Sequence, residues 1–205
     1  MTITVSSEEA QIATKRNQRK MFSFGNRKLP RHTAIFNMTP AETCPADKLG
    51  MCQLANSFTC YAKKAERMYK GVLPYRKRQQ RYWHDVTAEN FVKRLLKEKK
   101  GRKIKYLRLN ESGDFKSQEC VDKAIRIAKL LEEYGITCYM YTARKDLDYS
   151  NRGPLVINGS NFMVDNCFKT VYTKGPLPSP YCIADCRKCS MCTKKLSKTI
   201  LAAHH

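Results

Sequence analysis

The alternation of apolar and polar positions along this 205-residue chain predicts strands and helices that follow one another in turn. Short apolar runs bounded by turn residues such as Pro40 and Gly135 are typical of buried strands. The predicted strands cover residues 33–38, 104–109, 136–142 and 155–158.

Helical spacing of apolar side chains fills the intervals between these strands. Thr87 is a suitable N-cap for a helix over residues 88–100, and Gly101 is a suitable end for it. A longer helix is predicted from Ser117 to Tyr134, where apolar residues recur every three or four positions. Less regular helical patterns cover residues 61–70 and 75–84.

This order of elements predicts an α/β protein whose strands run parallel. The visible strands are too few for a closed eight-stranded barrel, so we expect a partial (β/α) barrel or a small, mostly parallel sheet. Three regions follow from the pattern: a polar lead-in, an α/β domain and a cysteine-rich segment with a metal-binding loop. They span residues 1–25, 26–174 and 175–205.

Composition narrows the choice of compartment. The chain has ten cysteines, no N-terminal apolar leader and no apolar run of about 18 residues. We therefore expect no membrane span and a cytoplasmic location. Disulfides are rare there, and grouped cysteines indicate metal binding.

The C-terminal cysteines form the tightest group, with the spacing Cys-x3-Cys-x2-Cys-x2-Cys. Its members are Cys182, Cys186, Cys189 and Cys192. Soft thiolate ligands select iron–sulfur clusters or zinc. Structural zinc usually takes two pairs of cysteines separated by a longer insert, so this compact run favours a 4Fe-4S cluster, with zinc as the alternative.

A second group, Cys44-x7-Cys52-x7-Cys60, directly follows the first predicted strand. Loops at the carboxyl ends of strands are where α/β proteins carry their functional residues. Three thiolates would leave one iron of a four-iron cluster open to a small molecule. Cys167 is the candidate for a fourth ligand, and the two groups could also share a single cluster.

Polar residues at the end of the second long strand form a further candidate site. Glu111, Ser112 and Asp114 follow residues 104–109, and Gly113 permits a tight turn between them. We expect these three side chains to bind a cofactor or substrate.

These features together resemble a known family. The three-cysteine loop ending in Cys60-Tyr61-Ala62, the segment LRLNESGDF at residues 107–115 and the C-terminal cysteine run are similar to the phage "gene product eighty-eight" domain family. The resemblance extends over about residues 30–195.

More distantly, the layout is similar to that of radical S-adenosylmethionine enzymes. That resemblance implies a 4Fe-4S cluster on the first cysteine group, with S-adenosylmethionine on its open iron and its amino group held by Glu111. The departure from that family is the spacing Cys-x3-Cys-x2-Cys, which is absent from the first loop and occurs at Cys182, Cys186 and Cys189 instead.

The net charge of +21 is concentrated in residues 62–105. Tyrosines and a tryptophan alternate there with cations, a combination that suits single-stranded nucleic acid or RNA. The predicted contacts are Arg76, Lys77, Arg78 and Arg81.

The sequence therefore predicts two alternative functions. The first is a radical S-adenosylmethionine-like enzyme with one or two iron–sulfur clusters, acting on or near nucleic acid. The second is a non-catalytic nucleic-acid-binding protein whose iron–sulfur or zinc sites are structural or redox-sensing.

Overall fold

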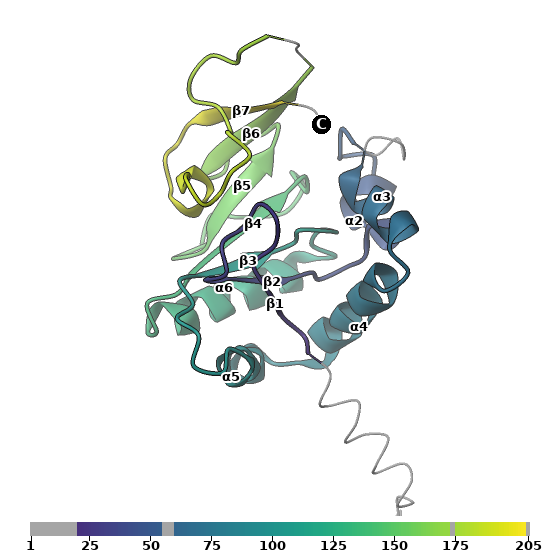
Figure 1. The fold of residues 1–205 in the computed structure, drawn as a ribbon, viewed down its shortest axis with the longest axis vertical. Coiled ribbons are helices and arrows are strands. Elements are labelled where there is room, and N and C mark those ends of the chain that lie inside the picture. Colours follow the sequence, from purple (N-terminus) through teal and green to yellow (C-terminus); the bar gives the residue numbers. More distant parts are fainter. Residues whose placement is uncertain (1–19, 55–59, 173–174, 204–205) are drawn as a thin grey trace, which may run out of the picture.

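A seven-stranded sheet organises the protein in the computed structural model, which describes residues 20–54, 60–172 and 175–203 (Figure 1). The strands are β1 (Ser23–Phe24), β2 (Thr33–Phe36), β3 (Tyr106–Leu109), β4 (Thr137–Thr142), β5 (Val156–Ser160), β6 (Asn166–Val171) and β7 (Thr199–Ala203).

Strand order in the sheet follows chain order from β1 to β7. All neighbouring pairs from β2 to β7 are parallel, and β1 alone pairs in the antiparallel direction with β2. The predicted mostly parallel sheet is confirmed. Because parallel strands share one direction, the loops that follow β2, β3 and β4 meet at one edge of the sheet.

Five helices accompany the sheet: α2 (Pro45–Lys48), α3 (Tyr61–Met68), α4 (Val72–Asp85), α5 (Ala88–Glu98) and α6 (Gln118–Glu132). Two 3-10 turns, η1 (Ala41–Thr43) and η2 (Met191–Thr193), complete the described elements. The Thr87 hydroxyl accepts from the Asn90 amide and caps α5, as predicted. Within the described ranges, no helix combines the length and apolar character needed to cross a bilayer.

The main core lies between α5, α6 and one face of the sheet. Leu107 and Leu109 alternate inward from β3, and Phe36 meets Phe91 of α5 with ring centroids 4.9 Å apart. Each such side chain stabilises the fold by about 1.5–3 kcal/mol through burial. Residues 1–19 of the predicted lead-in lie outside the described residues, whereas Met21 and Phe22 belong to this core.

The opposite face of the sheet is covered by the C-terminal cysteine segment. Cys192 packs with Tyr139 and Val156 in a second, smaller cluster, and the rings of Tyr141 and Phe168 lie against it. The sequence predicted a cysteine-rich segment over residues 175–205 with a metal-binding loop in it, and no strand. The segment instead ends in β7, which pairs with β6 along five residues and so belongs to the sheet.

A turn at residues 110–114 joins the end of β3 to the loop after β2. Gly113 has φ +76°, a conformation that other residues rarely adopt, and a Cβ built on it would overlap the hydroxyl and carbonyl oxygens of Thr39. The absence of a side chain at this position therefore allows the two loops to touch.

We predict that Gly113→Ala lowers the free energy of unfolding by about 2–4 kcal/mol, the sum of overpacking and backbone strain. Gly135→Ala is the matched control, because Gly135 also has positive φ but has nothing within 4 Å of the added Cβ. The control should lose only about 1 kcal/mol in urea denaturation. Equal losses in the two variants would show that contact with Thr39 adds nothing to the cost of a side chain at position 113.

Candidate functional site

The first cysteine group gathers around one cavity at the carboxyl edge of the sheet. Cys44 precedes α2, and Cys60 precedes α3. Both residues and Cys52 line a cavity of about 130 Å³. The turn at residues 110–114 forms another part of its wall. The three cysteines and the predicted cofactor residues thus lie in one site.

Two charged contacts hold the cysteine loop in this shape. Lys63 of α3 pairs with Asp47 of α2 at 2.6 Å, which joins the two ends of the loop. The Glu66 carboxylate accepts hydrogen bonds from the backbone amides of Ala41 and Glu42, and so fixes α3 against η1. The cysteines are therefore positioned by contacts between the elements that flank them.

Burial favours the protonated thiol at Cys44 and Cys52. It raises the pKa of Cys44 to about 12, with smaller contributions from the neighbouring Asp114 and Cys52, and it also raises the pKa of Cys52. Among the described residues, no three His, Cys, Asp or Glu side chains are grouped closely enough to hold a metal ion. A metal would have to draw the sulfurs together and displace their protons.

Asp114, one of the predicted cofactor residues, has a structural role, because its carboxylate binds groups of the protein itself. Its carboxylate accepts from the Phe115 amide at 2.8 Å, the Thr142 hydroxyl at 2.7 Å and the Ala143 amide at 2.8 Å. Burial raises its pKa to about 6 although these bonds favour the charged form. Asp114 thus positions the wall of the cavity.

Glu111 occupies a more accessible place on the same turn. Its carboxylate accepts from the Asn26 side chain, and its carbonyl accepts from the Tyr61 hydroxyl at 2.8 Å. Because Tyr61 follows Cys60, this second bond ties the cysteine loop to the end of β3. Among the described residues, the second carboxylate oxygen of Glu111 has no hydrogen-bond partner.

Two residues that line this cavity carry polar atoms without a partner among the described residues. Ser112 is 3% exposed and Asn110 is 4% exposed, yet the Ser112 Oγ and the Asn110 Nδ2 have no hydrogen-bond partner in the described ranges. Buried polar atoms are nearly always satisfied, so this pair indicates a place for a polar ligand. Asn110 was not among the predicted site residues, although its position at a strand end was the available signal.

The C-terminal cysteines line a separate cavity on the covered face of the sheet. It is bounded by all four cysteines together with Tyr141 and Phe168, and its volume is about 20 Å³. Burial raises the pKa of Cys186 to about 11 and also raises that of Cys192, while a hydrogen bond with Tyr141 acts against the rise at Cys192. Tyr141 lines the first cavity as well.

The remaining cysteines lie outside both cavities. Cys138 is buried in β4, and Cys120 accepts from the Trp83 ring at 3.4 Å. Cys167 neighbours Phe168 on β6, so the two side chains point to opposite faces of the sheet. The structure does not bring Cys167 to either group.

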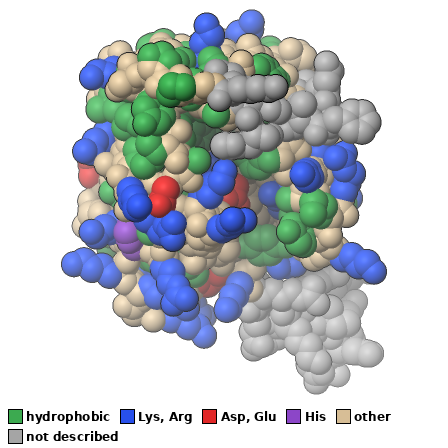
Figure 2. All heavy atoms as spheres, turned by 45° about the horizontal axis from the view of Figure 1, so that its top comes forward, with side chains coloured by type: hydrophobic (Ala, Val, Ile, Leu, Met, Phe, Trp, Pro, Cys, Tyr) green, Lys and Arg blue, Asp and Glu red, His purple; other side chains and the backbone are tan. Residues whose placement is uncertain are grey.

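The four residues of α4 that were predicted to contact nucleic acid differ in their exposure to solvent and in their partners. Arg76 is buried and pairs with Glu66 at 2.9 Å, so its guanidinium is withdrawn from the surface. Lys77 pairs with Glu42, and Arg78 lies over the Tyr75 ring. Arg81 is exposed. Figure 2 shows Lys and Arg side chains spread widely over one face of the molecule, among few acidic ones.

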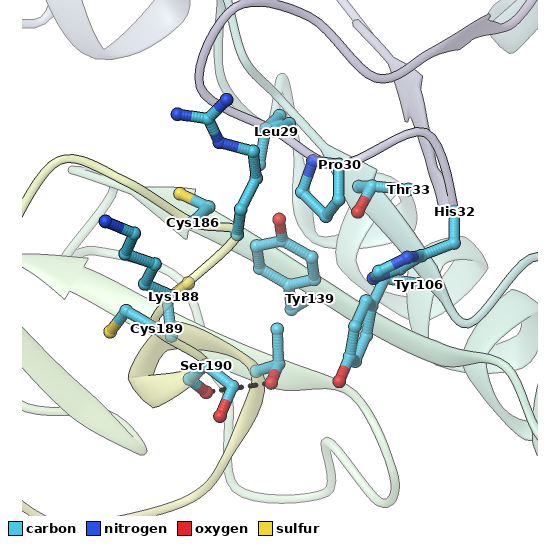
Figure 3. A pocket seen from close by; sticks show the side chains of 13 residues that line it. Leu29, Pro30, His32, Thr33, Tyr106, Tyr139, Cys186, Lys188, Cys189 and Ser190 are labelled. Carbon is cyan, nitrogen blue, oxygen red and sulfur yellow. Dashed lines mark hydrogen bonds between the residues drawn. The ribbon is translucent and has the colours of Figure 1, made fainter.

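A third cavity, of about 260 Å³, is lined in part by three of the C-terminal cysteines, Cys186, Cys189 and Cys192 (Figure 3). Tyr139 stands in its centre, with the rings of Tyr106 and His32 on one side and Lys188 on the other. The Tyr106 and Tyr139 rings meet edge to face at 6.2 Å. The combination of aromatic rings and a nearby cation distinguishes the lining of this cavity from that of the other two.

Fold and sites together define an α/β protein with two separate cysteine groups, one lining a single cavity and the other lining two. The chain belongs to the Gene product 88 family, whose match covers residues 6–161. That range contains the first cysteine group and the turn at residues 110–114, whereas the C-terminal group lies beyond it. No curated protein and no solved structure is significantly similar to the chain.

Because the Ser112 hydroxyl has no hydrogen-bond partner in the described ranges, we can predict how its removal affects the free energy of unfolding. Ser112→Ala should change the free energy of unfolding by less than about 0.5 kcal/mol, since it removes no hydrogen bond within the protein. Thr142→Val should cost about 1–3 kcal/mol, because it removes a donor to the buried Asp114. Urea denaturation measures both, and a Ser112→Ala loss as large as that of Thr142→Val would contradict the assignment.

Proposed function

We propose that this protein is an iron–sulfur protein of radical S-adenosylmethionine-like layout, with a reactive centre at the first cysteine group. The observation that carries the proposal is the shared cavity, in which three cysteines, the turn after β3 and two unpartnered polar atoms meet. The second centre is held by the four C-terminal cysteines and serves an auxiliary or structural role.

The donor set fits such a centre by its chemistry. Thiolates prefer iron–sulfur clusters and zinc, and metal sites commonly take their final shape only on binding. A four-iron cluster on three thiolates supplies an iron with a free position for a small molecule. Four thiolates, as at the C-terminal group, complete the ligand set.

Residues of the turn at 110–114 are suited to hold that small molecule. The Asn110 amide and the Ser112 hydroxyl offer bonds that the protein leaves unused. The Glu111 carboxylate suits a positively charged group, such as the amino group of S-adenosylmethionine. Asp114 and Gly113 keep the turn in place without contacting the ligand themselves.

Metal analysis tests the proposal directly. Protein purified without oxygen should contain iron and acid-labile sulfide, and replacement of Cys44, Cys52 and Cys60 by Ser should remove about half of the iron. Replacement of all four C-terminal cysteines should remove the other half. Cys120→Ser is the control, since Cys120 lines neither cavity, and it should retain all of the iron.

The outcomes separate the alternatives. A colourless protein with stoichiometric zinc would contradict iron–sulfur binding while keeping the thiolate sites, and a protein without metal would contradict both. If iron is present, S-adenosylmethionine added to the reduced protein should change its electron paramagnetic resonance spectrum. An unchanged spectrum would favour purely structural or redox-sensing clusters.

A non-catalytic nucleic-acid-binding protein is the second candidate, and the third cavity favours it. Rings that stack on bases beside cations that neutralise phosphates are typical of single-strand binding sites. Tyr106 and His32 provide the rings, and the exposed Lys188 provides a cation.

We predict that Lys188→Glu weakens the binding of single-stranded RNA. It should also lower the salt dependence of the binding constant by about 0.7 logarithmic units for each phosphate that the protein no longer neutralises. Lys93→Glu, on the exposed side of α5, has the same change in net charge and serves as control. Equal weakening in both variants would indicate a general effect of charge instead of a specific interaction at this cavity.

A further inference from the structure

Arg108 projects from β3 toward the face of the sheet that carries the C-terminal cysteines. Its neighbours Leu107 and Leu109 point into the main core, so Arg108 points the opposite way. Its guanidinium lies over the ring of Tyr141, with 5.1 Å between the guanidinium carbon and the ring centroid. Tyr141 in turn lines the cavity of the C-terminal group.

The charge of Arg108 is poorly compensated. The Nε atom is closed off from solvent and has no hydrogen-bond partner, and no ion pair joins the guanidinium to any residue in the described ranges. The two arginines that are fully buried are paired, Arg76 with Glu66 at 2.9 Å and Arg144 with Asp146 at 2.7 Å. An unpaired cation that is partly withdrawn from water costs stability.

Tyrosine rings and thiols surround this cation. Tyr61, Tyr139 and Tyr141 lie within its electrostatic reach, as does Glu111, whose carboxylate binds Asn26. Cys186 and Cys192 line the same cavity as Tyr141, the ring over which the guanidinium lies. Neutral thiols provide no counter-charge, whereas thiolates would.

We propose that Arg108 is the counter-charge of a metal centre held by the four C-terminal cysteines. The inference rests on the proposed metal binding and adds a residue outside the ligand set. A divalent ion, or a cluster core of the same charge, on four thiolates carries a net charge of about −2. A cation held over Tyr141, which lines the cavity of these cysteines, stabilises that charge in a partly buried site.

The proposal explains why an otherwise unfavourable residue occupies β3. In the metal-free protein, Arg108 is a half-buried cation without an ion-pair partner and destabilises the fold. In the metal-bound protein, the same cation faces an anionic centre. Replacing it should therefore have opposite effects on the two forms, which no purely structural role produces.

The test uses Arg108→Met and Arg108→Lys in the full-length protein with Cys52→Ser, which removes a thiolate from the first group. Zinc alone is the probe, and its affinity is measured by competition with a chelator. Arg108→Met should weaken zinc binding about 10- to 100-fold, the usual effect of removing a residue that supports a metal site. Arg108→Lys keeps the charge and should retain most of the affinity.

Urea denaturation supplies the second measurement. In the metal-free protein, the unfolding midpoint of Arg108→Met should equal or exceed that of the parent, and in the zinc-bound protein it should be lower. Arg76→Met is the control, because the Arg76 charge is paired with Glu66, and its midpoint should fall in both forms.

Each outcome decides a separate question. Unchanged zinc affinity in Arg108→Met, or a lower midpoint in its metal-free form, would overturn the role of Arg108 while leaving metal binding intact. Absence of zinc and iron binding in the parent protein would overturn the metal sites, and the role of Arg108 with them.

Discussion

The Asp114 carboxylate is the interaction on which the candidate site depends. Two of its three hydrogen bonds join the turn after β3 to the end of β4, and the third comes from the adjacent Phe115 amide. The same turn also touches the loop after β2, through Gly113 and Thr39. The carboxyl edge of the sheet is thus one connected structure, and the first cysteine group lies against it.

Local patterns were sufficient to predict the centre of the sheet and the helices that cover it. β2 to β5, α5 and α6 each have strong apolar periodicity or a recognisable cap. β6 and β7 were missed because their pairing depends on contacts between distant segments, and their polar residues interrupt the apolar pattern. The shared cavity of the first cysteine group was anticipated only in part, since its unpartnered atoms are visible solely in three dimensions.

Charge was the least predictable feature from sequence. Arg76 belongs to a run of cations that suggested a surface contact, but Glu66, ten residues earlier, holds it in the interior. Arg108 stands in an ordinary strand pattern, and nothing in the sequence distinguishes it from a solvated arginine. In both cases the environment of the charged group is decided by the packing of neighbouring elements, which sequence periodicity does not encode.

Tyr141 lines both the cavity of the first cysteine group and the smaller cavity of the C-terminal group. A molecule or metal that shifts this ring from one side alters the space and the charge on the other side. The binding free energies of the two sites are then linked, and linkage is reciprocal: whatever factor the first site imposes on the second, the second imposes on the first. A single aromatic ring would thereby make two separate cysteine groups respond as one unit.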